Sequence, residues 1–107
     1  MSTKIYNKLV RDRIPEIISA RGAVCETAIL SEADYLTHLE IKLGEELAEY
    51  KQDQNLEELA DLLEVIYACA AARGYSTAEL EALRKDKADK RGGFEKRILL
   101  KSVTEED

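Results

Sequence analysis

The sequence of 107 residues has no tryptophan, one phenylalanine, one proline, one histidine and two cysteines. Cys25 and Cys69 are isolated and lack the spacing of a metal site, so they favour free thiols over a disulfide framework. The residue three before His38 is Tyr35, so the Glu-x-x-His pairs of a di-iron bundle are missing. No glycine-rich phosphate loop follows a strand, because Gly92-Gly93 is typical of a helix stop.

Basic charge and long apolar runs are also scarce. The 16 lysines and arginines are outnumbered by 22 aspartates and glutamates, which gives a formal net charge of −6 at pH 7. Binding a nucleic-acid polymer through its phosphates needs a basic field, so we expect no such partner. Nothing approaches the apolar run of about 18 residues that spans a membrane, and no apolar stretch of a signal peptide follows Lys8. We therefore expect a cytoplasmic protein without a membrane partner.

Residues 1–107 have the length of a single domain, and helix signals dominate them. Pro15 in a first turn and Gly22 as a stop predict a short helix from residue 12 or 13 to about residue 21. Ser31, Asn55 and Ser76 are typical N-cap residues and predict three more helices. We expect the first of these to end before the polar segment 51–55, the second at about residue 73, and the third at about residue 90.

The remaining segments carry weaker signals. Residues 4–11 indicate an extended arm, and residues 23–30 a short strand or a loop on the core. Residues 94–103 indicate a short strand, for which the arm is the candidate partner. Residues 104–107 indicate a frayed acidic tail. The sequence thus predicts an all-α fold, a helical bundle of about four helices with short extended segments at the termini.

The helix expected after Asn55 is apolar over most of its circumference. One stripe and its flank comprise Leu59, Leu63, Ile66 and Ala70, widened by Leu62, Val65 and Cys69. A helix this apolar lies at the centre of a bundle or faces another subunit. Because Ile41 and the alanines at 68 and 70–72 add to this surface, we expect a homo-oligomer, and the sequence leaves dimer and tetramer open.

Two carboxylate pairs stand at helical spacing on either side of the polar segment 51–55. They are Glu46-x-x-Glu49 and Glu58-x-x-Asp61. Residues three apart share a helix face, so folding back at the polar segment would bring all four to one level. Four like charges between helices call for a cation, and oxygen ligands suit Mg²⁺ or Mn²⁺. The alternative for Glu58 is a capping role at the start of its helix.

The paired acids across a helix hairpin resemble the motif of the all-α nucleoside triphosphate pyrophosphohydrolases. That superfamily includes MazG, the dimeric dUTP pyrophosphatases, the dCTP pyrophosphatases and phosphoribosyl-ATP pyrophosphohydrolase. Residues 6–18 (YNKLVRDRIPEII) and 90–94 (KRGGF) are similar to a MazG-like subgroup. The surroundings expected of the histidine-biosynthesis enzyme are missing, so phosphoribosyl-ATP is not the favoured substrate.

The resemblance implies Mg²⁺-dependent hydrolysis of a nucleoside triphosphate to monophosphate and pyrophosphate, in a nucleotide house-cleaning role. It also implies that Glu46, Glu49, Glu58 and Asp61 are metal ligands. One of Glu46 and Glu49 is our candidate for activating the attacking water.

Basic side chains must hold the phosphate oxygens that the metal does not reach. The candidates for substrate binding are Lys8, Arg11, Lys87, Lys90 and Arg91, with Asn7 or Tyr6 as candidates for contact with the base or sugar. The alternative to an enzyme is a non-enzymatic acidic helical module with an interaction or regulatory role.

Overall fold

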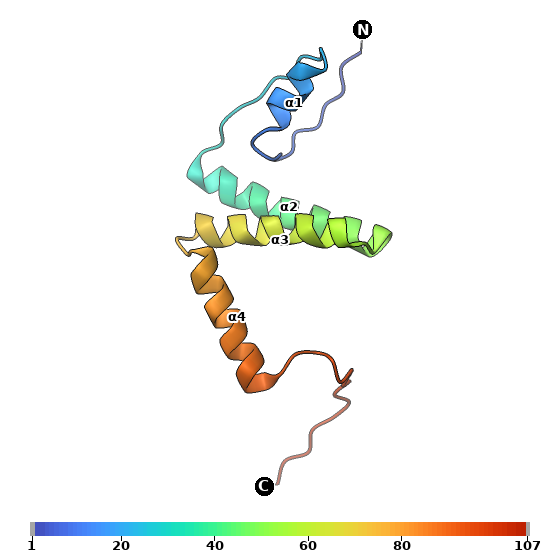
Figure 1. Cartoon of the computed structure of the whole chain (residues 1–107), viewed down its shortest axis with the longest axis vertical. Coiled ribbons are helices and arrows are strands. Elements are labelled where there is room, and N and C mark those ends of the chain that lie inside the picture. The colour runs from blue at the N-terminus through green and yellow to red at the C-terminus, as the bar shows by residue number, and fades with distance from the viewer. Residues whose placement is uncertain (1, 107) are drawn as a thin grey trace.

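The computed structural model describes residues 2–106 and contains four helices and no strand in that range (Figure 1). They are α1 (Ile14–Ala20), α2 (Glu32–Asp53), α3 (Leu56–Ala72) and α4 (Thr77–Arg91). The predicted all-α class with four helices is confirmed. No helix within the described residues is long and apolar enough to cross a membrane.

The strand expected over residues 94–103 is absent, and that prediction is wrong. Residues 23–30 form a loop, one of the two alternatives, but this loop does not pack on the core, because Val24 and Ile29 are each 98% exposed. Residues 94–103 are irregular because a turn interrupts them: the amide of Arg97 donates to the carbonyl of Phe94 at 3.1 Å, and Arg97 has a φ of 57°. Neither segment has a partner strand to satisfy its backbone groups. Residues 104–106 are irregular, and residue 107 of the predicted tail lies outside the described range.

The three longer helices begin where their cap residues predict. The side chains of Ser31, Asn55 and Ser76 each accept a hydrogen bond from the backbone amide three residues later, at 3.2, 2.9 and 3.0 Å. Only Ser76 forms a complete capping box, in which the Glu79 carboxylate accepts from the Ser76 amide at 3.2 Å. Local side-chain chemistry therefore sets these starting points.

Helices α2 and α3 lie side by side as an antiparallel hairpin (Figure 1). Gln54 and Asn55 form the whole connection, since α2 continues to Asp53 and includes most of the predicted polar turn. Gln54 has a φ of 52°, and its amide donates to the Tyr50 carbonyl at 2.8 Å. The buried apolar residues of the described chain, Leu39 (2% exposed) and Val65 (8%), come from the two arms of this hairpin.

The rest of the chain extends away from the hairpin (Figure 1). The N-terminal arm and α1 lie on one side, α4 leaves from the end of α3 on the other, and the termini are far apart. The radius of gyration is 19.1 Å, whereas a compact domain of this length has about 13 Å. The predicted stripe of Leu59, Leu63 and Ile66 on α3 faces outward and is exposed. Cys25 and Cys69 are free thiols, each half-buried.

Candidate metal centre

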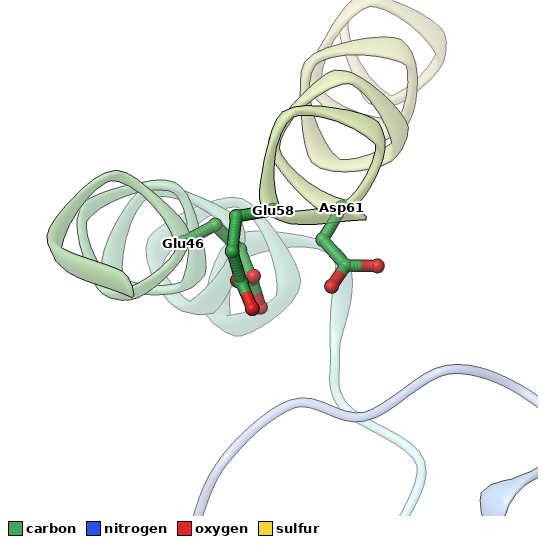
Figure 2. Close-up of side chains that lie close together, drawn as sticks. All are labelled: Glu46, Glu58 and Asp61. Atoms are coloured by element: carbon green, nitrogen blue, oxygen red, sulfur yellow. The ribbon is translucent and has the colours of Figure 1, made fainter. Parts of the chain in front are cut away.

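The helical hairpin brings three of the four predicted carboxylates together. Glu46 of α2 and Glu58 and Asp61 of α3 each contribute an oxygen, and these three oxygens lie within 4.8 Å of one another. Figure 2 shows the carboxylates of Glu46 and Glu58 directed to the same side of the hairpin, with Asp61 next to them. The short connection between the helices allows residues twelve and fifteen positions apart to meet in this way.

Glu46 is buried, with 7% of its surface exposed, although it is a charged residue on a helix. One of its oxygens, Oε1, lies 3.4 Å from Nζ of Lys42, one helical turn earlier. The other, Oε2, is buried without a hydrogen-bond partner, and Oε2 of Glu58 is in the same situation. Buried oxygens without a partner are costly and uncommon, so these two oxygens are available to accept a bond from a cation. The donors present, all carboxylate oxygens, fit Mg²⁺ or Mn²⁺.

The electrostatics of the cluster point the same way. Burial is the main cause that raises the pKa of Glu46; the charge of Glu49 adds to it, and Lys42 partly opposes it. Desolvation also raises the pKa of Glu58, followed by the negative charges of Glu49, Asp53 and Asp61. Both carboxyl groups therefore resist ionisation, and a nearby cation would favour their charged forms.

Glu49 is exposed and does not belong to the close group of three. It nevertheless lies beside that group, because its negative charge raises the pKa of both Glu46 and Glu58. We expected four equivalent carboxylates; the structure instead clusters three of them and leaves Glu49 exposed to solvent.

The alternative role of Glu58 as a reciprocal cap does not explain its carboxylate. Its backbone amide donates to Asn55, but the return bond that completes the box at Ser76 is not formed at Asn55. The side chain is directed towards Glu46 instead (Figure 2). Helix capping therefore accounts for the position of the Glu58 backbone, and the acidic cluster for its side chain.

Asp61 is tied to the N-terminal arm. Nη2 of Arg11 donates to Oδ1 of Asp61 at 2.6 Å. A cleft of about 450 Å³ lies between the arm with α1 and the hairpin. Glu46 and Asp61 are on its wall, with Arg11, Lys42 and apolar residues that include Leu9, Ile14, Ile17, Leu39 and Val65. Because Arg13 also lines it, the cleft joins the acidic cluster to three cations and an apolar surface.

Arg11 alone among the predicted substrate-binding residues lines this cleft. Asn7 and Lys8 are exposed on the arm, where the Lys8 ammonium lies 5.6 Å from the centre of the Tyr6 ring. Three others lie on α4: Lys87, Lys90 and Arg91 are exposed, and Lys90 pairs with Asp86 at 3.1 Å. Because α4 diverges from the hairpin, a single chain does not bring these three to the cluster (Figure 1).

Lys42 is a cleft residue that sequence reasoning missed. It pairs with both Glu46, at 3.4 Å, and Glu45, at 3.6 Å. The i, i+4 spacing between Lys42 and Glu46 is the signal that could have identified it, although such spacing is common on exposed helix faces. Its half-buried side chain next to the cluster distinguishes it from those surface lysines.

Comparison with known proteins gives a partial match. A stretch of 44 residues, 41% of this chain, is 48% identical to an uncharacterised protein of Mycolicibacterium smegmatis (strain ATCC 700084 / mc(2)155) and covers 45% of that protein. The similarity therefore spans less than half of either chain. No family model and no solved structure matches the chain. Since the relative has no described activity, the functional argument depends on the site itself.

The raised pKa values of Glu46 and Glu58 predict how pH affects the metal-free protein. The folded state holds protons on these groups at pH values above 4.5, their ordinary pKa, at which the unfolded chain releases them. Their contribution to stability is therefore present below that pH and is lost as pH rises through the folded-state pKa. Urea unfolding with a chelator should show the variant Glu46→Gln/Glu58→Gln gaining stability over the wild type between pH 4.5 and neutrality. A difference that stays constant with pH would contradict this prediction.

Proposed function

We propose that the chain holds a divalent metal ion, Mg²⁺ or Mn²⁺, through Glu46, Glu58 and Asp61, and hydrolyses a nucleoside triphosphate to the monophosphate and pyrophosphate. The unpartnered, buried oxygen of Glu46 next to that of Glu58 carries this proposal. When bound, such an ion neutralises phosphate charge and polarises the phosphorus. It also offsets the repulsion between an anionic substrate and a protein of net charge −6.

The chain's own residues around the cleft suit a nucleotide. Its volume of about 450 Å³ falls within the usual range for small-molecule sites, about 300–1,000 Å³. Arg11 and Lys42 offer hydrogen-bond donors to phosphate oxygens, and Leu39 and Val65 contribute an apolar surface for a base or sugar. Positive and apolar walls on one cleft favour a ligand with a charged end and a flat apolar end.

Glu49 is the better candidate for activating the attacking water. Glu46 is buried and shares an oxygen with Lys42, whereas Glu49 is exposed beside the cluster. An exposed carboxylate with direct access to solvent can accept a proton from water that lies at the edge of the metal centre. We therefore assign metal binding to Glu46 and acceptance of the proton from the attacking water to Glu49.

The choice of pyrophosphate release over other phosphate chemistry is supported by the resemblance of the paired acids to the all-α nucleoside triphosphate pyrophosphohydrolases. The same resemblance supports a cytoplasmic house-cleaning role, in which damaged or excess nucleotides are removed. The fold agrees with this choice, since the acids stand on facing helices of an all-α hairpin.

A panel of normal and modified nucleoside triphosphates tests the function. With Mg²⁺, we expect equal amounts of monophosphate and pyrophosphate from at least one member, and no turnover with a chelator. Orthophosphate and a diphosphate would instead indicate a phosphatase. If no triphosphate in the panel is turned over, the non-enzymatic interaction module becomes the better reading; the exposed apolar face of α3 is the feature that favours it.

A second copy of the chain is the partner that we propose for this exposed face. Leu59, Leu63 and Ile66 on α3 and Ile41 and Leu47 on α2 are all exposed. Exposed apolar side chains on both helices of a chain with very few buried residues are typical of a subunit interface. In an assembly, Lys87, Lys90 and Arg91 on the protruding α4 could reach the cleft of a neighbouring copy. A homo-oligomer would thus supply the phosphate contacts that one chain lacks.

A further inference from the structure

We propose that Arg11 is a built-in placeholder at the metal centre, which holds Asp61 and the N-terminal arm in place until the centre is loaded. When the metal ion is bound, Asp61 binds the ion in place of Arg11, and Arg11 is free to bind the phosphate groups of the substrate. This inference rests on the proposed metal centre and assigns a positioning role to a residue of the arm.

The first observation is that Arg11 makes the polar link between the arm and the hairpin. Its guanidinium lies 2.6 Å from Asp61, fifty residues later in the sequence. The neighbouring Arg13 pairs locally with Glu16 at 3.4 Å, and no other ion pair in residues 2–106 joins the arm to α2 or α3. Helix α1 makes no close backbone approach to α2 or α3. Within the described residues, Arg11 is therefore the ionic contact that ties the arm to the hairpin.

The second observation is that Arg11 holds an oxygen donor of the acidic cluster. Asp61 supplies one of the three carboxylates whose oxygens lie within 4.8 Å of one another. Its partners Glu46 and Glu58 each keep a buried oxygen without a hydrogen bond. The guanidinium thus neutralises the charge of Asp61 but does not contact Glu46 or Glu58. A cation that all three carboxylates share must compete with Arg11 for the charge of Asp61.

The third observation is that the pair is easily exchanged. The side chains of Arg11 and Asp61 are 56% and 41% exposed, so water screens their attraction. Arg11 also lines the cleft that contains Glu46 and Lys42, within the same pocket as the acids. Its planar set of donors suits bidentate contact with a phosphate group. Binding of the metal ion would then free Arg11 to bind a phosphate group.

Calorimetric titration with Mn²⁺ alone, without any nucleotide, tests this inference. The variant Arg11→Gln should bind Mn²⁺ about two- to fivefold more tightly than the wild type, which is the scale of an exposed ion pair. Arg13→Gln is the matched control. It also removes one positive charge, only two residues from Arg11, but Arg13 pairs with Glu16 and not with an acid of the cluster. We expect its Mn²⁺ affinity to stay close to that of the wild type.

Limited digestion with chymotrypsin gives a second readout, the attachment of the arm. Mn²⁺ should accelerate cleavage after Tyr6 and Leu9 in the wild type and in Arg13→Gln. In Arg11→Gln, cleavage should be fast with or without Mn²⁺, because the arm is already released.

The outcomes separate the two proposals. Equal or weaker Mn²⁺ binding by Arg11→Gln, or cleavage of the wild-type arm that does not respond to Mn²⁺, would overturn the placeholder role and leave the metal centre standing. If the wild type binds no Mn²⁺ in the titration, both the metal centre and the placeholder role are wrong.

Discussion

Replacing Glu46 and Glu58 together with glutamine should abolish divalent-cation binding and metal-dependent pyrophosphate release while the helices remain intact. The two residues supply the buried oxygens that lack partners. Even outer partners of metal ligands typically contribute about 10- to 100-fold, so we expect turnover to fall by more than about 100-fold. Glutamine keeps the shape of each side chain and removes the charge, which relieves repulsion within the hairpin. Circular dichroism should therefore show unchanged helix content.

The neighbouring pair Glu45→Gln/Glu57→Gln is a closely matched control. It removes the same number of charges from the same two helices, one residue away from each site position. Neither Glu45 nor Glu57 belongs to the acidic cluster. We expect this control to bind Mn²⁺ and release pyrophosphate at close to the wild-type level. Retention of Mn²⁺ affinity in Glu46→Gln/Glu58→Gln would show that the cation site lies elsewhere.

Introducing charge on the outer face of α3 should produce the largest change in assembly. Leu59 and Leu63 are each more than two-fifths exposed in the single chain, one helical turn apart. Burying a leucine contributes about 1.5–3 kcal/mol, and a two-fold interface buries each residue twice. Leu59→Lys/Leu63→Lys should therefore weaken self-association by at least about 100-fold. Light scattering across protein concentrations measures this directly.

The linker residues Val24 and Ile29 provide the control, because both are 98% exposed and lie outside the helices. Val24→Lys/Ile29→Lys adds the same two charges and should leave the oligomeric mass unchanged. If basic residues of α4 complete a neighbouring cleft, the dissociated Leu59→Lys/Leu63→Lys variant will lose turnover but still bind Mn²⁺. A wild-type protein that stays monomeric at high concentration would contradict the proposed assembly.

Helix boundaries could be predicted from the sequence because short-range chemistry sets them. Ser31, Asn55 and Ser76 each bond to an amide three residues away, and that spacing is visible in the sequence. The clustering of Glu46, Glu58 and Asp61 could also be predicted, since helical periodicity and one polar break suffice to place them. These features need only the geometry of two helices and their connection.

Features that depend on the arm could not be predicted in the same way. Arg11 meets Asp61 across fifty residues, and no periodic pattern encodes that contact. The burial of Lys42 follows from the cleft that the arm and hairpin enclose. The strand expected over residues 94–103 failed because weak alternation does not provide a pairing partner. The stripe on α3 was predicted from its apolar residues, and its exposure in the single chain follows from the way α4 and the arm extend away from the hairpin.

The two-residue connection of Gln54 and Asn55 makes the geometry of the hairpin sensitive to the length of its turn. Surface turns are normally where chains accept insertions most freely. Here the length of the connection also sets the register of the hairpin, that is, which residues of α2 lie opposite which residues of α3. A longer turn would leave both helices free to form but would let them slide, and Glu46 would no longer face Glu58. The tolerance of this segment to length change should therefore be as narrow as that of the acids themselves, although it contributes no atom to the cluster.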